Sequence, residues 1–214
     1  MNQKIKTIAE CLDELFPDAH CELNYQNDFE LLCAVLLSAQ TTDERVNLVT
    51  KELFKIYPTA KELAKADVKE VEKIIHSIGL YHNKAQNLIK MARSLDAKYD
   101  GKVPKDKEAL TSLSGVGTKT ANVVLSEYYD LPYFGVDTHV SRIAKRLNMA
   151  KDDDSVLKIE TKLMRLFPKS RYKKTHHQMI FMGRYLCKAK KPECDKCPQG
   201  IKKYCRFSAC DKDA

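Results

Sequence analysis

The sequence predicts an all-α fold. Apolar residues recur every three or four positions through most of the 214 residues, as they do along one face of an amphipathic helix. Capping residues precede these segments, and proline or glycine follows them. No segment shows the two-residue alternation of a half-buried strand, and no Asn-Gly pair marks a tight hairpin.

The helices are predicted in order along the chain. Ile5, Ile8, Leu12 and Leu15 form the apolar stripe of a first helix. Asp28 is a candidate cap for residues 29–37, an almost wholly apolar segment that is predicted to be a buried central helix. Later starts carry a capping side chain, and these are Asp43, Thr59 with Glu62 as a capping box, Asp67 and Ser155. The predicted interruptions are Pro58, Gly79, Asp100 with Gly101, Pro132 and Pro168.

Charge and cysteine content divide the chain into two predicted lobes. Residues 21–131 form a near-neutral helical block, whereas the tail from about Leu131 is basic and rich in cysteine. Residues 165–206 hold thirteen lysines and arginines against two acidic residues, within a chain of net charge +8. A basic face suits a nucleic acid, although a solvated charged surface explains the charge equally well. A groove between the lobes is the expected binding cleft.

The sequence has the features of an intracellular protein. No apolar run approaches the roughly 18 residues of a membrane-spanning helix, and the N-terminus lacks the apolar block of a signal peptide. We therefore expect a cytoplasmic protein with no membrane partner.

Two glycines, Gly115 and Gly117, separate two predicted helices. Their bare backbone would let the amides at the next helix N-terminus approach a phosphate, but a plain tight turn explains a Gly-x-Gly pair as well. Lys119 lies in the first turn of that helix. The helix dipole there favours a neutral amine that can attack carbon. Taken alone, an ordinary surface lysine is the commoner interpretation.

Asp137 begins another predicted helix. Helix capping is the simplest role for it, but a carboxylate fixed at this place can also stabilise a developing positive charge and move protons. His139 follows two residues later, and a structural role is the simpler expectation for it.

Five of the eight cysteines lie in the last 28 residues. Four of them have the spacing Cys187-x6-Cys194-x2-Cys197-x7-Cys205, and Cys210 follows. Clustered thiols in a reducing compartment indicate a metal, and four cysteines suit zinc or a [4Fe-4S] cluster. The Cys-x2-Cys pair by itself favours zinc, and a disulfide is the least favoured alternative. The isolated Cys11, Cys21 and Cys33 are expected to be buried, inert thiols.

Five segments together resemble the endonuclease III family, and the resemblance covers nearly the whole chain. The segments are Leu-Leu-Ser-Ala-Gln at 36–40, Ile-Gly-Leu-Tyr at 78–81, Leu-Ser-Gly-Val-Gly-Thr-Lys-Thr-Ala-Asn-Val-Val at 113–124, Val-Asp-Thr-His-Val at 136–140, and the cysteine motif from Cys187. The resemblance implies a two-lobed, all-α helix-hairpin-helix DNA glycosylase. Residues 21–131 form the central lobe, and residues 1–20 with 132–214 form the lobe that carries an iron-sulfur cluster.

The resemblance also assigns roles to single residues. Lys119 matches the lysine that forms the Schiff base, and Asp137 matches the catalytic aspartate. Gly115 and Gly117 match the hairpin that holds the DNA backbone. The remaining residues expected to contact DNA are Gln40 and Leu80, which match residues that enter the duplex where the damaged base has left, and the cluster-loop cations Lys190 and Lys191.

The resemblance changes the expected metal from zinc to a [4Fe-4S] cluster held by Cys187, Cys194, Cys197 and Cys205. The last gap is seven residues where the family usually has five, so Cys210 remains an alternative fourth ligand. Ser114 stands where proline is frequent in the family, and we expect it to loosen the turn slightly.

The implied activity is removal of oxidised pyrimidines from duplex DNA, followed by strand cleavage at the abasic site through a Schiff base and β-elimination. The expected partner is duplex DNA with damaged pyrimidines or abasic sites, bound by a monomer at the bacterial nucleoid. A monofunctional relative is one alternative, but such relatives typically lack a lysine at the position of Lys119. A non-enzymatic DNA-binding protein is another, and it would not need both Lys119 and Asp137.

Overall fold

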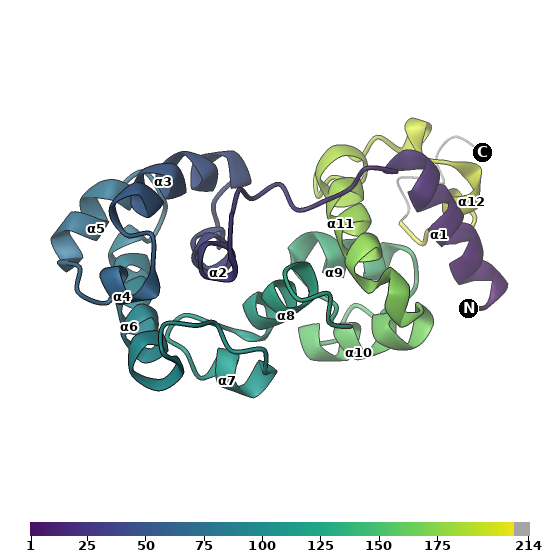
Figure 1. Ribbon diagram of the computed structural model, residues 1–214. Helices are drawn as coiled ribbons and strands as arrows, with labels where there is room; N and C mark the ends of the chain where they lie inside the picture. The colour runs from purple at the N-terminus through teal and green to yellow at the C-terminus, as the bar shows by residue number, and fades with distance from the viewer. Residues whose placement is uncertain (208–214) are drawn as a thin grey trace. The chain divides into compact units, whose positions relative to one another are not determined.

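The computed structural model describes residues 1–207, and every regular element in that range is a helix (Figure 1). The all-α prediction is therefore confirmed. Contacts between Cα atoms divide the chain into two compact units. The middle unit comprises Glu22–Leu131, and the terminal unit combines Met1–Cys21 with the chain from Pro132 onward.

The middle unit is built around a buried helix, α2, which packs on α3, α6 and α8. All nine residues from Phe29 to Leu37 are buried, as the apolar sequence predicts. Leu31, Leu32 and Leu37 are completely enclosed. The helices of this unit are α2 (Asp28–Leu37), α3 (Asp43–Ile56), α4 (Ala60–Leu63), α5 (Val68–Ile75), α6 (Tyr81–Tyr99), α7 (Lys107–Thr111) and α8 (Thr118–Glu127).

Capping side chains define most helix starts, and the predicted capping box of Thr59 with Glu62 is present. Two predicted caps are wrong by one residue. Asn27, not Asp28, caps α2 by accepting a hydrogen bond from the Glu30 amide, and Thr42, not Asp43, caps α3. Both Asn and Thr are good caps, so the choice between adjacent polar residues depends on which backbone is extended.

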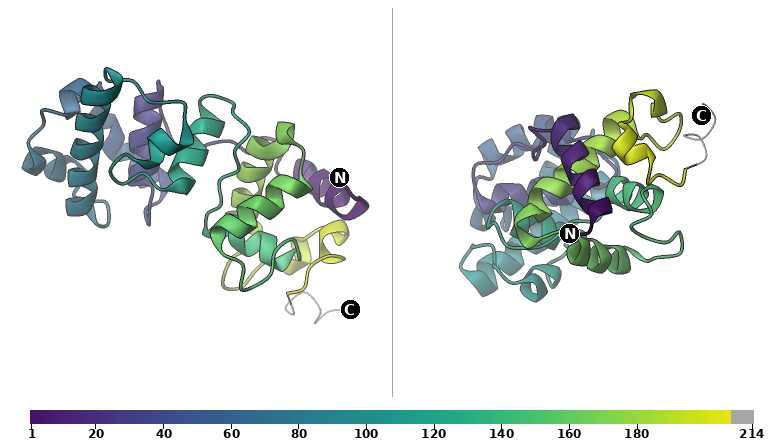
Figure 2. Two further views of the ribbon diagram at one scale, coloured as in Figure 1. Left: turned by 90° about the horizontal axis from the view of Figure 1, so that it is seen from below. Right: turned by 90° about the vertical axis from the view of Figure 1, so that its right-hand side faces the viewer.

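The terminal unit joins the first helix to the last ones. Figure 2 shows the purple α1 beside the yellow C-terminal segment, and α1 packs on α11 and α12. Its core includes Ile5, Ile8, Leu12 and Phe134. The elements of this unit are α1 (Gln3–Leu15), α9 (Thr138–Arg146), α10 (Val156–Leu166), η1 (Lys169–Arg171), α11 (Tyr172–Phe181), the π-helix η2 (Met182–Leu186), η3 (Cys194–Lys196) and α12 (Gln199–Lys202).

None of the helices within residues 1–207 has both the length and the apolar character required to cross a membrane.

Candidate functional site

The glycine turn at 112–117 connects α7 to α8 in the middle unit, and these two helices pack on each other. Gly115 has a left-handed φ of 78° and lies against α6 so closely that an added Cβ would be 2.9 Å from the Cβ of Asn87. The Ser114 hydroxyl donates to Oδ1 of the same Asn87 at 2.9 Å. Ser114 therefore ties the turn to α6, which offsets the loosening expected where the family often has proline.

Gly117 is the N-cap residue of α8 and has no side chain to cover the first-turn amides. An added Cβ there would meet no atom within 4 Å, so the space beside this backbone is open. Lys119 follows in the first turn and is partly exposed. The hairpin thus combines uncovered amides, a helix N-terminus that favours an anion, and an accessible amine.

Gln40 and Leu80 lie in two loops of the middle unit and are both exposed, with 58% of Leu80 accessible to solvent. Both have left-handed backbones, with φ of 55° for Gln40 and 61° for Leu80. This conformation is unusual for residues other than glycine, asparagine and aspartate. Strained backbone conformations cluster at functional sites, so these two loops are candidates for contact with a partner.

Asp137 is the N-cap of α9 in the terminal unit. Its Oδ1 accepts a hydrogen bond from the Val140 amide at 2.7 Å, so the predicted capping role is present. The carboxylate is partly exposed and its orientation is fixed by this bond. On the same helix, burial lowers the pKa of the His139 imidazole, and the nearby charges of Arg142 and Arg184 act in the same direction.

Two arginines of α9 hold the loop that begins at Cys187, and the sequence did not reveal them. Arg142 Nε donates to the Cys187 carbonyl at 3.2 Å. The buried Arg146 donates to Cys187 Sγ at 3.1 Å and to the carbonyls of Lys188 and Ala189 at 2.8 and 3.2 Å. The only sequence signal is a pair of arginines four residues apart, which places them on one face of the helix.

The four spaced cysteines line one pocket of the terminal unit. Cys187, Cys194, Cys197 and Cys205 border it together with Leu147, Met182, Leu186 and Ile201. None of the seven cysteines of the described range is in a disulfide, and Cys210 lies outside the described residues. Burial, followed by the charges of the other three sulfurs, raises the pKa of the Cys197 thiol to about 12. Thiolates that line one partly buried pocket need a positively charged group to neutralise them, so these four cysteines are a donor set that fits a metal centre.

Within residues 1–207, no group of three or more histidine, cysteine, aspartate or glutamate side chains is placed to hold a metal ion.

The loop between Cys187 and Cys194 and the η3 helix that follows it carry two kinds of lysine. Lys188 and Lys196 pair with Glu193 at 2.6 and 2.7 Å and lower the pKa of its carboxyl to about 2. Lys190 and Lys191 are exposed and have no ion-pair partner in the described part of the chain. Lys190 and Lys191, the two lysines predicted to contact DNA, are therefore the lysines of this loop without a carboxylate partner among residues 1–207. Their charge can attract an external anion such as a phosphate.

Comparison with known proteins decides the family. Residues 33–169 match the HhH-GPD superfamily of base excision DNA repair proteins. The chain is 48% identical to endonuclease III of Bacillus subtilis over 91% of this chain and 90% of that protein. It is 43% identical to endonuclease III of Escherichia coli over 87% and 88% of the two chains. The chain belongs to the endonuclease III family.

Solved structures of endonuclease III agree with this assignment. A trapped covalent complex of an endonuclease III with DNA superposes with a TM-score of 0.89 at 51% identity, covering 96% of this chain and 97% of the other. A thermostable thymine-DNA glycosylase shares the fold with a TM-score of 0.85 at 22% identity, covering 97% of this chain and 98% of that one. As an endonuclease III family member, the chain is a base excision repair DNA glycosylase with AP lyase activity.

Proposed function

We propose that this endonuclease III family member removes oxidised pyrimidines from duplex DNA and cleaves the strand with Lys119 as nucleophile. The observation that carries the proposal is the position of Lys119 in the first turn of α8, directly after the open Gly117 backbone. Amides and amine on one turn would let the protein hold a phosphate next to the sugar that reacts.

In the proposed reaction, Lys119 Nζ attacks C1′ of the flipped nucleotide while the C1′–N bond to the base breaks. Asp137 assists this departure by stabilising positive charge on the sugar and later transfers protons. Opening of the sugar gives an imine between Nζ and C1′. Loss of a C2′ proton then expels the 3′ phosphate with the electron pair of the C3′–O bond, which nicks the strand.

DNA contacts in this proposal come from both units. The turn at Gly115 and Gly117 holds one phosphate through main-chain amides, and Lys190 and Lys191 attract the backbone elsewhere. Gln40 and Leu80, here called the wedge pair, enter the space that the flipped base vacates. Wedging helps offset the few kcal/mol that unstacking a base requires.

A [4Fe-4S] cluster held by Cys187, Cys194, Cys197 and Cys205 completes the proposal. The cluster would neutralise the thiolates that line the pocket and fix the loop that carries Lys190 and Lys191. Its proposed role is structural. We further propose that the protein acts as a monomer in the bacterial cytoplasm, at the nucleoid.

Borohydride trapping on a duplex with thymine glycol tests the nucleophile and the lesion class together. The wild-type protein is expected to form a covalent adduct, and Lys119→Gln is expected to form none. Lys61→Gln, which changes an exposed lysine on α4, is the matched control and should trap normally.

Two other outcomes would overturn the proposal. Release of free base without any adduct would indicate a monofunctional enzyme that uses water. Salt-dependent binding without release of base would indicate a binding protein.

A further inference from the structure

Lys84 is a buried ammonium group in the first turn of α6, with 5% of the residue exposed. Its Nζ donates to the carbonyls of Leu37 and Ala39 at 2.9 and 2.6 Å and to the Thr41 hydroxyl at 3.0 Å. Three donors on the ammonium thus meet three oxygen acceptors, which satisfies the group completely.

These three oxygens belong to the end of α2 and the loop that follows it. Leu37 is the last residue of α2, and its carbonyl lies at the negative end of the helix dipole. No carboxylate pairs with Lys84 in residues 1–207, and burial alone lowers the pKa of its amine. The charge is therefore held by neutral oxygens and the dipole, whose positions depend on the backbone of residues 37–41.

The same contacts bring the two loops of the wedge pair together. Lys84 bonds the carbonyl of Ala39, directly before Gln40, and it stands four residues after Leu80, whose carbonyl accepts from the Lys84 amide at 3.0 Å. A Cβ on Gly79 would lie 3.9 Å from the carbonyl oxygen of Gln40, so the backbones of the two loops are adjacent.

Left-handed conformations at glutamine and leucine are unfavourable unless neighbouring contacts impose them. The hydrogen bonds from Lys84 supply such contacts. The Gln40 loop cannot relax without breaking these bonds to the buried ammonium group. The backbone of the wedge pair then already has its binding conformation before DNA binds. Less conformational entropy is lost on binding as a result.

We propose that Lys84 is a positioning residue that joins the two loops of the wedge pair and presents Gln40 and Leu80 together to the duplex. This inference rests on the proposed role of these two residues in base flipping. Lys84 itself does not touch DNA in this proposal, and it acts through the backbone of the 38–41 loop.

The test compares Lys84→Met with Lys90→Met, which changes an exposed lysine on the same helix. Excision is measured in single turnovers on thymine glycol in a fully paired duplex and in an unpaired bubble. Because a bubble needs little wedging, Lys84→Met is expected to slow excision about tenfold or more from the duplex and less than about threefold from the bubble. Equal slowing on both substrates, as from general damage to the fold, would overturn the inference.

A second readout follows the duplex directly. A 2-aminopurine placed opposite the lesion reports the loss of its partner by a rise in fluorescence. The rise is expected with wild type and Lys90→Met, and it should be reduced with Lys84→Met at saturating protein. A full rise with Lys84→Met would contradict the inference.

A double-mutant cycle separates this inference from the proposed function of the wedge pair. If Lys84 acts through the pair, Lys84→Met adds no further slowing to a Gln40→Ala, Leu80→Ala protein. If the Gln40→Ala, Leu80→Ala protein excises normally, the role of the wedge pair fails. If that protein is slow and Lys84→Met slows it further by its full factor, the wedge role stands and the inference for Lys84 fails.

Discussion

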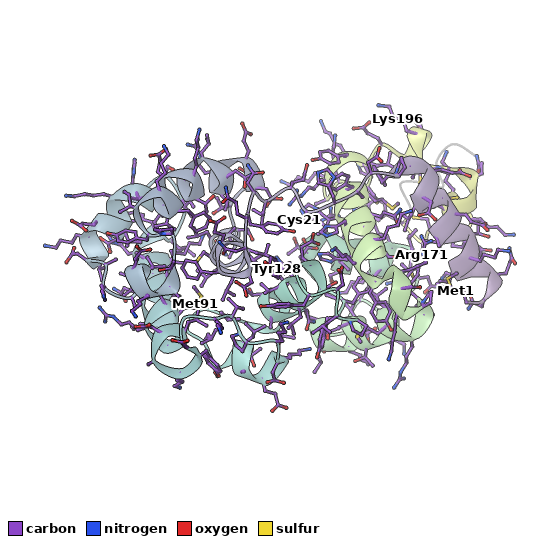
Figure 3. The ribbon with its side chains drawn as sticks, in the orientation of Figure 1. Met1, Cys21, Met91, Tyr128, Arg171 and Lys196 are labelled. Atoms are coloured by element: carbon purple, nitrogen blue, oxygen red, sulfur yellow. The ribbon has the colours of Figure 1, made fainter. Side chains whose placement is uncertain are left out.

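Asp13 of α1 and Arg171 of η1 form a two-point ion pair, with 2.9 Å between Oδ2 and Nη1 and 3.0 Å between Oδ1 and Nη2. Arg171 is labelled in Figure 3, on the helical segment that faces α1. Lys174 also pairs with Asp13 at 2.7 Å, and Gln178 donates to it at 2.9 Å. The N-terminal helix is thus attached to elements more than 150 residues later in the chain.

Replacement of Asp13 by asparagine is expected to lower the free energy of unfolding by about 1–2 kcal/mol, since Arg171 and Lys174 lose their common anion at a partly exposed site. These partners hold the pKa of the Asp13 carboxyl well below its usual range. Its contribution is therefore present above the ordinary pKa of about 3.9 and is lost as the pH falls below that value. Urea unfolding at pH 7 measures the loss, with Glu14→Gln as an exposed control on α1; equal stabilities of Asp13→Asn and wild type would refute the expectation.

Gly115 and Gly117 give a matched pair of alanine substitutions in one turn. Gly115→Ala places a Cβ 2.9 Å from Asn87 at a φ of 78°, and it should destabilise the protein by about 2 kcal/mol. Gly117→Ala meets no atom within 4 Å and should leave stability within about 0.5 kcal/mol of wild type.

The same pair separates folding from DNA contact. The methyl group of Gly117→Ala covers the amides that are proposed to hold phosphate, so DNA affinity is expected to fall although the protein remains stable. Denaturant unfolding and a binding titration at fixed salt give the two quantities. Normal DNA affinity of a stable Gly117→Ala protein would argue against phosphate contact at this turn.

Asp137 offers a way to distinguish its capping role from its proposed catalytic one. Asparagine caps helices as well as aspartate does, so Asp137→Asn should keep the bond from Val140 and unfold with the wild-type free energy. Asp137→Ala should lose about 1 kcal/mol. Both variants should excise thymine glycol about 10² times more slowly, because neither carries the charge that stabilises the sugar. An Asp137→Asn protein that excises at the wild-type rate would limit Asp137 to capping.

The sequence predicted the features that depend on neighbouring residues. The apolar run of α2, the capping box at Thr59 and the cap at Asp137 are all formed within a few residues, and all three are present. Where two polar residues are adjacent, as at Asn27 and Asp28, local rules could not choose between them.

Features that depend on distant residues were missed. The acceptors of Lys84 lie 43 to 47 residues away, and those of Arg146 lie 41 to 43 residues away. In the sequence, Lys84 and Arg146 are indistinguishable from exposed charged residues on a helix. Their burial and their hydrogen-bond partners depend on how the helices pack, which the local sequence does not specify. The left-handed backbones of Gln40 and Leu80 were missed for the same reason, since glutamine and leucine, unlike glycine, have no preference for that conformation.

His139 should make the terminal unit less stable in mild acid. Burial, with Arg142 and Arg184 nearby, lowers its pKa in the folded protein, whereas Asp137 acts in the opposite direction with a smaller effect than burial. The unfolded chain, with a histidine pKa of about 6.5, therefore binds a proton more readily than the folded one. Well above pH 6.5 the free energy of unfolding is unaffected by His139. As the pH drops from 6.5 to the pKa of His139 in the folded protein, the free energy of unfolding falls by at most about 1.4 kcal/mol per pH unit.

Urea unfolding at several pH values between 5 and 7.5 tests this expectation. His139→Gln removes the titrating ring and should flatten the dependence, while His20→Gln, which changes an exposed histidine of the same unit, should not. Buried His176 and His177 remain in both variants, so the difference between the curves isolates His139. The expectation fails if the His139→Gln curve is as steep as the wild-type curve, because burial of His139 would then place no penalty on its protonation.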